Sequence, residues 1–279
     1  MKSIKQRLTS QQKNKIKRWI RKTKSRIQFW VRPVTIEKME FYLRDKLCIK
    51  EGDKIFVTSA FGSLNAAFSP NDLIQLLMKV VGEDGVIMMP YYPPGSSGEW
   101  AASGAIFDMQ QTKSSMGVLT NVFSKFPGVI KSVHPTKAVC VWGKDAEAIA
   151  KGHVQCKSPY AAESPYGKFL KLHSKSVGLG AGKCPMGHCC EDLLNPSLSH
   201  YKKDVANLGI HQNHEVAYYP TLIHDMSKLK IVPVDYIKNS PDYRKVKIGY
   251  DYSYVIDNDK LFDFYKKEFA AGRSSLCEN

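Results

Sequence analysis

Hydrophobic and polar positions along the chain predict alternating helices and strands. Apolar residues recur at helical spacing in the segment 34–47, and short apolar runs bounded by glycine, proline or aspartate are typical of buried strands. An alternation of such elements is typical of an α/β protein. We expect helices at 34–47, 70–81 and 165–172 and one that runs up to 126, and strands at 54–58, 86–89 and 176–180.

The helix expected at 70–81 has a complete start signal. Ser69 can accept a backbone amide, Pro70 suits the first helical position, and Asp72 favours the positive end of the helix. Residues 91–105, by contrast, contain two prolines followed by glycines and serines. We interpret them as a long surface loop, and such loops in compact domains are often functional.

Charge divides the chain into two parts. The chain has a net charge of +15. Residues 1–36 contain twelve Lys and Arg and no acid, so the remaining residues carry a net charge of only about +3. We expect a basic amphipathic arm at 1–33 and one domain at 34–279, because Pro33 disfavours helix at the preceding residue. Within 13–32, the apolar positions at mostly helical spacing are Ile16, Trp19, Ile20, Ile27, Trp30 and Val31.

Such an arm can lie on an anionic membrane surface, with its indole rings among the headgroups. A solvated arm without fixed structure is the equally simple interpretation. Nucleic-acid binding ranks last, because no nucleic-acid-binding motif follows the arm.

The composition argues for a cytoplasmic protein. No run of about 18 apolar residues predicts a membrane-spanning helix, and the basic start lacks the apolar block of a secretion signal. The seven cysteines show no disulfide-scaffold pattern, so reduced thiols are expected. We therefore expect a cytoplasmic location, with the arm able to hold the protein at the inner membrane face. The oligomeric state stays open.

A spaced motif between residues 106 and 153 resembles the aminoglycoside 3-N-acetyltransferase family, which uses acetyl-CoA and is unrelated in fold to the GNAT acetyltransferases. The resemblance spans roughly residues 35–195. It implies a single α/β domain with a central mixed sheet flanked by helices, and a CoA-dependent acyltransferase activity. The residues that carry it are Phe107, Asp108, Thr112, Ser115, Met116, Gly117, Leu119, Thr120, Pro127, Gly128, Ser132, His134, Pro135 and Gly143.

His188 and Glu191 are the candidate catalytic pair. A spacing of three places both on one helix face, where a carboxylate can orient an imidazole and raise its basicity. Acyl transfer to an amine needs such a base, because a protonated ammonium cannot attack a thioester. The resemblance implies that His188 is the general base and Glu191 its orienting partner. Pro185 stands where the family usually has Thr, and the residues alone favour a solvated histidine on a loop beside a helix-capping glutamate.

Two loops of small residues are candidates for holding acetyl-CoA. Small side chains let backbone amides approach a ligand, and free amides with hydroxyls can bind phosphate or pantetheine oxygens. Without the resemblance the first would be an ordinary strand-to-helix loop, and Ala60 replaces one serine of the family's Ser-Ser pair. The candidate residues are Ser59, Ala60, Phe61 and Ser63 in the first loop, and Ser115, Met116 and Gly117 in the second.

His134, Asp108 and Tyr91 are further candidates for a supporting role. His134 belongs to a His-Pro step, and its imidazole can polarise a thioester carbonyl or hold a loop. The family follows this step with His and Ser, where this chain has Lys137 and Ala138. A contact of that Ser with the coenzyme would therefore be lost here.

Cysteines and histidines after residue 180 raise two alternatives, a zinc-dependent hydrolase and a Cys–His nucleophile. No Cys-x-x-Cys pair exists, and adjacent cysteines rarely both bind one tetrahedral ion, so no metal is expected. Residues 211–215 look like a polar loop. The cluster comprises Cys184, His188, Cys189, Cys190 and His200.

The acceptor is expected to be an amino sugar that is not a polycation. Aminoglycosides are polycations and call for a carboxylate-rich site, but the body has no acidic excess and the loop 91–105 contains only Glu99. An amino sugar linked to a nucleotide or a lipid diphosphate, as used in surface-polysaccharide synthesis, fits better. The alternatives are an aminoglycoside-modifying enzyme and a catalytically inactive relative that binds membranes or polyanions, which the departures at Ala60, Lys137, Ala138 and Pro185 keep open.

Overall fold

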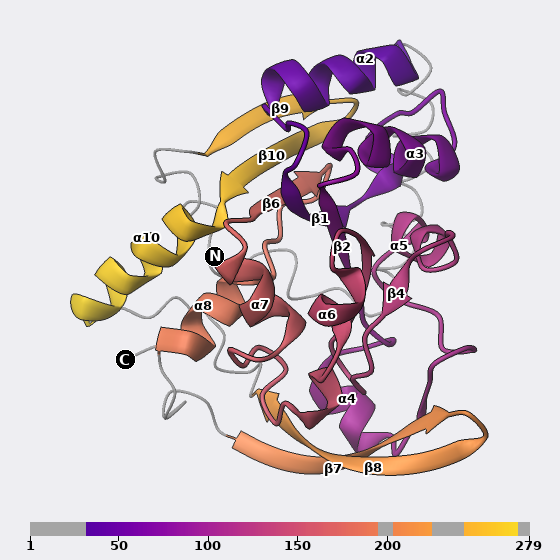
Figure 1. The fold of residues 1–279 in the computed structure, drawn as a ribbon, viewed down its shortest axis with the longest axis vertical. Coiled ribbons are helices and arrows are strands. Elements are labelled where there is room, and N and C mark those ends of the chain that lie inside the picture. The colour runs from indigo at the N-terminus through magenta and orange to yellow at the C-terminus, as the bar shows by residue number, and fades with distance from the viewer. Residues whose placement is uncertain (1–31, 195–202, 225–242, 273–279) are drawn as a thin grey trace, which may run out of the picture.

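The computed structural model describes residues 32–194, 203–224 and 243–272 (Figure 1). Almost all of the arm predicted at 1–33 lies outside these residues, and so does His200. No helix in the described ranges is both long and apolar enough to cross a bilayer.

A seven-stranded mixed sheet forms the centre of the molecule, in the order β4-β5-β2-β1-β6-β10-β9 (Figure 1). Strands β2, β1 and β6 are parallel, and the other four join antiparallel to their neighbours. The α/β fold with a central mixed sheet is therefore confirmed. The strand bounds are β1 Lys54–Ser59, β2 Val86–Tyr91, β4 Ile130–Lys131, β5 Ala138–Gly143, β6 Lys175–Leu179, β9 Arg244–Ile248 and β10 Asp251–Asp257.

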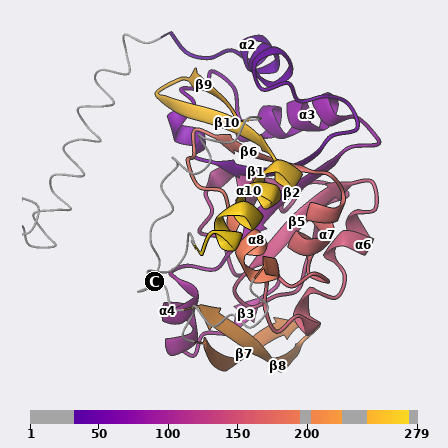
Figure 2. The same cartoon turned by 90° about the vertical axis from the view of Figure 1, so that its left-hand side faces the viewer.

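Helices cover both faces of this sheet. Alternate residues of β1 divide between two hydrophobic clusters, Ile55 and Val57 in one and Phe56 in the other. The first cluster packs under α2 Ile36–Phe41, the π-helical turn η3 Tyr42–Lys46, α3 Pro70–Val81 and α5 Val118–Phe123. The second packs under α6 Ala146–Ala150, α7 Pro165–Lys171, α8 Met186–Leu194 and α10 Asn258–Ala270 (Figure 2). Short 3₁₀ turns η4 Phe61–Ser63 and η5 His153–Gln155 complete this part.

The predicted helix starts follow from local capping. Ser69 and Asp72 form a reciprocal capping box at the start of α3, with Pro70 in its first turn. Ser164 caps α7 in the same way, by accepting the Gly167 amide. The helix expected at 34–47 is α-helical only to residue 41 and continues as the π-helical turn η3, which still buries Leu43.

Three expectations from the sequence need correction. Strand β2 continues through Pro90 to Tyr91, since Pro90 pairs with Val139 of the antiparallel neighbour β5. The surface loop expected at 91–105 contains a short helix, α4 Ser97–Ala102, because Ser96 and Glu99 form a capping box. The helix expected to run up to residue 126 ends at Phe123.

A separate three-stranded sheet lies at the bottom of Figure 1. Strands β7 Lys203–Gln212 and β8 Glu215–His224 pair along their full length, and β3 Phe107–Asp108 joins β7 in parallel. Residues 211–215 are thus the tip of a hairpin instead of a polar loop. Asn213 and His214 both have positive φ, +52° and +67°, as a two-residue hairpin turn requires.

Gly143 and Gly52 provide a matched pair for a stability test. Both have positive φ, but a Cβ at Gly143 would lie 2.1 Å from the Gly85 carbonyl oxygen, whereas one at Gly52 would meet nothing within 4 Å. We expect Gly52→Ala to cost about 1–2 kcal/mol from backbone strain alone. Gly143→Ala should cost clearly more, because it also pushes β2 and β5 apart. Urea unfolding followed by circular dichroism measures both, and equal losses would contradict this account.

Candidate active site at the strand ends

The carboxyl ends of the parallel strands meet at one edge of the main sheet. Strands β1, β2 and β6 end at Ser59, Tyr91 and Leu179. Because β5 runs the opposite way, it starts at this edge, with Ala138 opposite Tyr91. In open α/β sheets, ligands commonly bind outside such strand ends.

The two loops predicted to hold coenzyme A come together at this edge. A Cβ at Gly117 would lie 3.5 Å from the Ser59 carbonyl oxygen, so the loops 59–63 and 115–117 are in contact. Gly180, just after β6, faces the same loop, since its Cβ position is 3.0 Å from the Ser63 Cβ. The positive φ values of Gly117 and Gly180, +99° and +64°, suit glycine at both points of close approach.

The candidate residues in these loops differ in whether their polar groups are already hydrogen-bonded within the protein. The Ser115 amide donates to the Tyr92 carbonyl at 2.8 Å, and its hydroxyl donates to the Pro93 carbonyl at 3.0 Å. The Met116 amide donates to the Ser114 hydroxyl. These bonds fasten the second loop to the end of β2. By contrast, the Ser59 hydroxyl is buried and has no hydrogen-bond partner among the described residues.

His188 and Glu191 lie on α8, which follows β6 directly. The start of this connection crosses the sheet edge, since the Lys183 carbonyl accepts the Thr58 hydroxyl of β1 at 3.2 Å. The His188 ring is half-buried and stacks on the Tyr160 ring, with a centroid distance of 5.5 Å and an interplanar angle of 19°. Glu191 is buried at 2% exposure. His188 and Glu191 therefore lie on one helix, as their spacing predicts.

Three tyrosines form a buried cluster under His188. The Tyr160 and Tyr166 rings pack edge to face at 4.9 Å, and the Tyr92 and Tyr166 hydroxyls are 2.7 Å apart. Burial is the main cause that raises the pKa of all three phenols above the ordinary value. The phenols therefore stay protonated at neutral pH and act as hydrogen-bond donors within a firm aromatic platform.

Beside this cluster lies a buried histidine pair. The His134 and His153 rings are 4.4 Å apart, and each residue is only 1% exposed. The His134 Nδ1 accepts the amides of Thr136 and Lys137, so its proton lies on Nε2, which is buried without a partner in the described part of the chain. The His153 Nε2 bonds to the Pro159 carbonyl, and its Nδ1 bonds to the Ser132 hydroxyl.

The pKa values of both histidines are depressed. Burial lowers the pKa of His153 to about 3. Burial, followed by His153 and Lys137, holds the pKa of His134 well below its ordinary value. His134 is thus a neutral side chain with a fixed tautomer at neutral pH.

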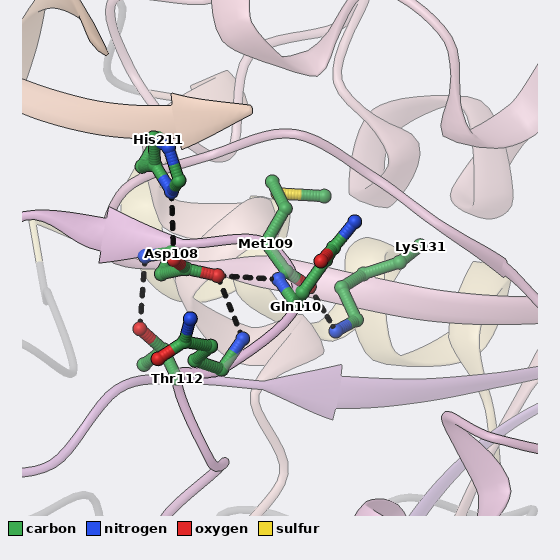
Figure 3. A network of polar contacts seen from close by, with 7 residues as sticks. Asp108, Met109, Gln110, Thr112, Lys131 and His211 are labelled. Atoms are coloured by element: carbon green, nitrogen blue, oxygen red, sulfur yellow. Dashed lines mark hydrogen bonds and ion pairs between the residues drawn. The ribbon is translucent and has the colours of Figure 1, made fainter. Parts of the chain in front are cut away.

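Tyr91 and Asp108 belong to a second network, which fastens the small sheet to the main one. Figure 3 shows the part of this network around Asp108. Asp108 accepts the amides of Gln110 and Gln111 at 2.7 Å each, and its other oxygen lies 2.7 Å from the His211 Nδ1. These bonds, led by the Gln111 amide and His211, lower the pKa of Asp108. The Tyr91 hydroxyl donates to the Thr112 carbonyl. Both residues therefore have structural partners in the 108–112 turn.

The cysteine-based alternatives gain no support. Within 32–194, 203–224 and 243–272, no group of three His, Cys, Asp or Glu side chains is placed to hold a metal ion. Cys189 and Cys190 are fully buried, and burial raises the pKa of both thiols, which disfavours a thiolate nucleophile.

Two cavities lie away from His188. One, of about 260 Å³, is lined by residues such as Lys50, Arg244 and Lys260. The other, of about 490 Å³, includes Ser158, whose hydroxyl donates to Asp192 of α8 at 2.5 Å. Neither cavity is lined by His188.

Comparison with protein families decides which family this fold and site belong to. The model of the aminoglycoside 3-N-acetyltransferases matches residues 56–270. The chain belongs to this family. The predicted family and the enzyme class, a CoA-dependent N-acetyltransferase, are thereby confirmed, with acetyl-CoA as cosubstrate. A comparison with curated proteins finds no matching sequence.

Solved structures share the acetyltransferase fold at low sequence identity. AAC-VIa bound to sisomicin is 19% identical with a TM-score of 0.73, over 87% of this chain and 100% of that one. AAC-IIIb in a binary complex with CoASH is 19% identical with a TM-score of 0.72, over 88% and 99%. The YokD protein from Bacillus subtilis is 22% identical with a TM-score of 0.71, over 86% and 94%. At these identities the likeness shows the fold alone.

Sequence reasoning missed the partners that surround the candidate residues of this acetyltransferase. Tyr92, Tyr160 and Tyr166 lie in three separate segments, and His153 meets His134 only in the folded chain. The tyrosine-rich composition was the only available signal, and it does not say which rings converge.

The buried histidines predict a loss of stability on mild acidification. The unfolded chain takes up a proton on each histidine below about pH 6.5, but folded His153 does not until about pH 3. The free energy of unfolding should therefore fall as the pH drops from 7 to 5, by up to about 1.4 kcal/mol per pH unit for each buried histidine. This window lies above the range in which carboxyl groups titrate.

Urea unfolding at several pH values measures this slope. His153→Phe removes one titrating group and should flatten the slope between pH 6.5 and 5. The matched control is His173→Gln, because His173 is exposed and its pKa is raised by Asp259. Its folded pKa lies above the unfolded one, so its small contribution has the opposite sign. A stability that does not change between pH 7 and 5 would contradict the buried neutral pair.

Proposed function

We propose that this enzyme acetylates the amine of an amino sugar by direct transfer, with His188 as general base. The observation that carries the proposal is the position of α8 relative to the strand ends. Its leading loop crosses the end of β1, and the loops 59–63 and 115–117 meet at the same edge. This arrangement supports a site in which the proposed base and the small residues proposed to hold the coenzyme lie at one edge of the sheet.

The residues at this edge fit acetyl-CoA, which supplies the acetyl group as an activated thioester. The Ser59 hydroxyl has no hydrogen-bond partner in the described ranges, and Gly117 and Gly180 have no side chains at points where backbones approach closely. We expect Ser59, Ser63 and Gly117 to hold the coenzyme. The bound CoASH in the fold relative AAC-IIIb supports a CoA site on this fold.

In this mechanism His188 removes a proton from the acceptor ammonium, which frees the nitrogen lone pair for attack on the thioester carbonyl. Tyr160 holds the plane of the imidazole by stacking, and Glu191, three residues further along α8, orients the ring and stabilises its protonated form. The nitrogen–carbon bond forms as the carbon–sulfur bond breaks. The nitrogen then gives up its second proton, the leaving thiolate takes up a proton to become CoASH, and protonated His188 returns the first proton to solvent. No acyl-enzyme is needed.

We propose an acceptor that is linked to a nucleotide or a lipid diphosphate, as in surface-polysaccharide synthesis. The domain that follows the basic arm has no acidic excess and carries only a small positive net charge, which argues against a site for polycations. The arm at 13–32 would bring the enzyme to the anionic inner face of the membrane from the cytoplasm. An aminoglycoside acceptor is the second candidate, favoured by the sisomicin bound to the fold relative AAC-VIa.

Replacing the base tests the reaction. His188→Ala should lower kcat by about 10²- to 10⁴-fold with any accepted amine, because proton removal then depends on water. Release of the CoA thiol, followed with glucosamine, UDP-glucosamine and kanamycin as acceptors, is the measurement. His173→Ala is the control, since His173 is exposed, precedes β6 at the end opposite Leu179, and bonds to Asp259. Turnover of His188→Ala at the wild-type rate would overturn the mechanism, and no thiol release with any amine would favour an inactive relative.

Replacing Ser59 tests the coenzyme site. Ser59→Ala should leave the melting temperature nearly unchanged, because no hydrogen bond to a described residue is lost. The Kd for CoA, measured by calorimetry, should rise about fivefold to tenfold for one lost hydrogen bond. Ser176→Ala is the matched contrast: its buried hydroxyl donates to Asn258 at 2.7 Å, so it should lower stability and spare CoA binding. An unchanged Kd in Ser59→Ala would remove Ser59 from the coenzyme site.

A further inference from the structure

Lys137 is a half-buried cation at the candidate active site, with no anionic partner among the residues that the structure describes. It directly precedes β5 at the strand-end edge, and its ammonium lies 4.3 Å from the centroid of the Tyr92 ring. Among the described residues it takes part in no ion pair, and its ammonium makes no hydrogen bond. An ammonium has three donors, and burying them without acceptors costs free energy.

A second lysine lies close enough to repel it. Burial, followed by the positive charge of Lys183, lowers the pKa of Lys137 to about 8. Lys183 is exposed, and its carbonyl accepts the hydroxyls of Thr58 and Tyr254. The two lysines come from different segments at this edge, Lys137 directly before β5 and Lys183 in the loop before α8. Two unneutralised like charges at one place are a cost that a bound anion removes.

Lys137 lies on the same face of the sheet as the candidate base. Its neighbours Ala138 and Val139 face opposite clusters, which places Lys137 with Val139 and Tyr92. Tyr92 bonds to Tyr166, Tyr166 packs on Tyr160, and Tyr160 stacks on His188. A continuous aromatic platform thus connects the lysine to the imidazole.

Resting on the function proposed above, we infer that Lys137, assisted by Lys183, binds a phosphate group of the acceptor and so selects an anionic amino sugar over a polycationic one. The residues expected to hold the coenzyme gather around Ser59 and Gly117, whose contact is at the end of β1. Lys137 lies two strands away, past β2, and on the same face of the sheet as His188. A phosphate there neutralises both cations, whereas a polycation adds to the repulsion.

Lys131 provides a matched control within the same chain. Its ammonium also lies over a tyrosine ring, 4.0 Å from the Tyr91 centroid, and it too is half-buried. However, it donates to the Met109 carbonyl at 2.7 Å (Figure 3), and Tyr91 faces the opposite cluster. If Lys137 served only to pack on an aromatic ring, the two lysines would respond alike to substitution.

The experiment compares acceptors that differ in phosphate. Wild type, Lys137→Met, Lys183→Met and Lys131→Met are assayed by thiol release with glucosamine, glucosamine 1-phosphate, UDP-glucosamine and kanamycin. We expect wild type to prefer a phosphorylated acceptor, and Lys137→Met to lose at least tenfold in kcat/KM for that acceptor. Its kcat/KM for glucosamine and its KM for acetyl-CoA should change less than twofold. Lys183→Met should show a smaller loss, and Lys131→Met none.

Three results would overturn the inference. One is an equal preference for phosphorylated and plain glucosamine in wild type. Another is an equal effect of Lys137→Met and Lys131→Met on that preference. The third is a raised KM for acetyl-CoA in Lys137→Met, which would assign the anion to the coenzyme instead of the acceptor.

A binding assay separates failure of this inference from failure of the proposed function. Inorganic pyrophosphate should raise the melting temperature of wild type and of Lys131→Met, but not that of Lys137→Met. If this pattern appears while no amine is acetylated, the anion site stands and the proposed reaction falls. If amines are acetylated while pyrophosphate stabilises all variants equally, the reaction stands and the lysine site falls.

Discussion

The parallel pairing of β2, β1 and β6 is the constraint on which the rest of the structure depends. This pairing brings the last residues of the three strands, Ser59, Tyr91 and Leu179, to one edge of the sheet, although they lie far apart in the chain. Reversing either pairing would send one strand end to the other side of the molecule. The antiparallel strand β5 adds its beginning to the same edge, and with it Lys137 and His134. Every candidate for chemistry in the main sheet is therefore placed by backbone hydrogen bonds.

The two faces of the sheet differ in what they bury at this edge. One face packs aliphatic side chains under α2, α3 and α5, in a cluster that also holds Tyr91. The other buries tyrosine hydroxyls and two imidazoles beside α7 and α8. These polar groups bond mainly to one another or to backbone, and the tyrosines and imidazoles themselves are uncharged at neutral pH. A cation on this face, Lys137, lies over the Tyr92 ring.

The sequence predicted the parts of this site that depend on near neighbours. The placement of His188 and Glu191 on one helix follows from their spacing, and the starts of α3 and α7 follow from Ser69 and Ser164. Prediction from the sequence failed where local patterns compete. The capping box of Ser96 was hidden among glycines and prolines, and the hairpin turn at Asn213 and His214 looked like a polar loop because its strands alternate with little hydrophobic contrast.

By itself the sequence determined the family, the helix starts, the strand cores and the uneven distribution of charge, because each is a property of residue types at short separations. Only the tertiary structure decided that Tyr92, Tyr160 and Tyr166 would form one cluster and that His134 would be neutral beside His153. It also decided that Lys137 would lie over the Tyr92 ring, with no acid among the described residues to neutralise it. The physical reason is that burial and ion pairing are set by whichever segments the sheet brings together, and these lie tens of residues apart in the chain.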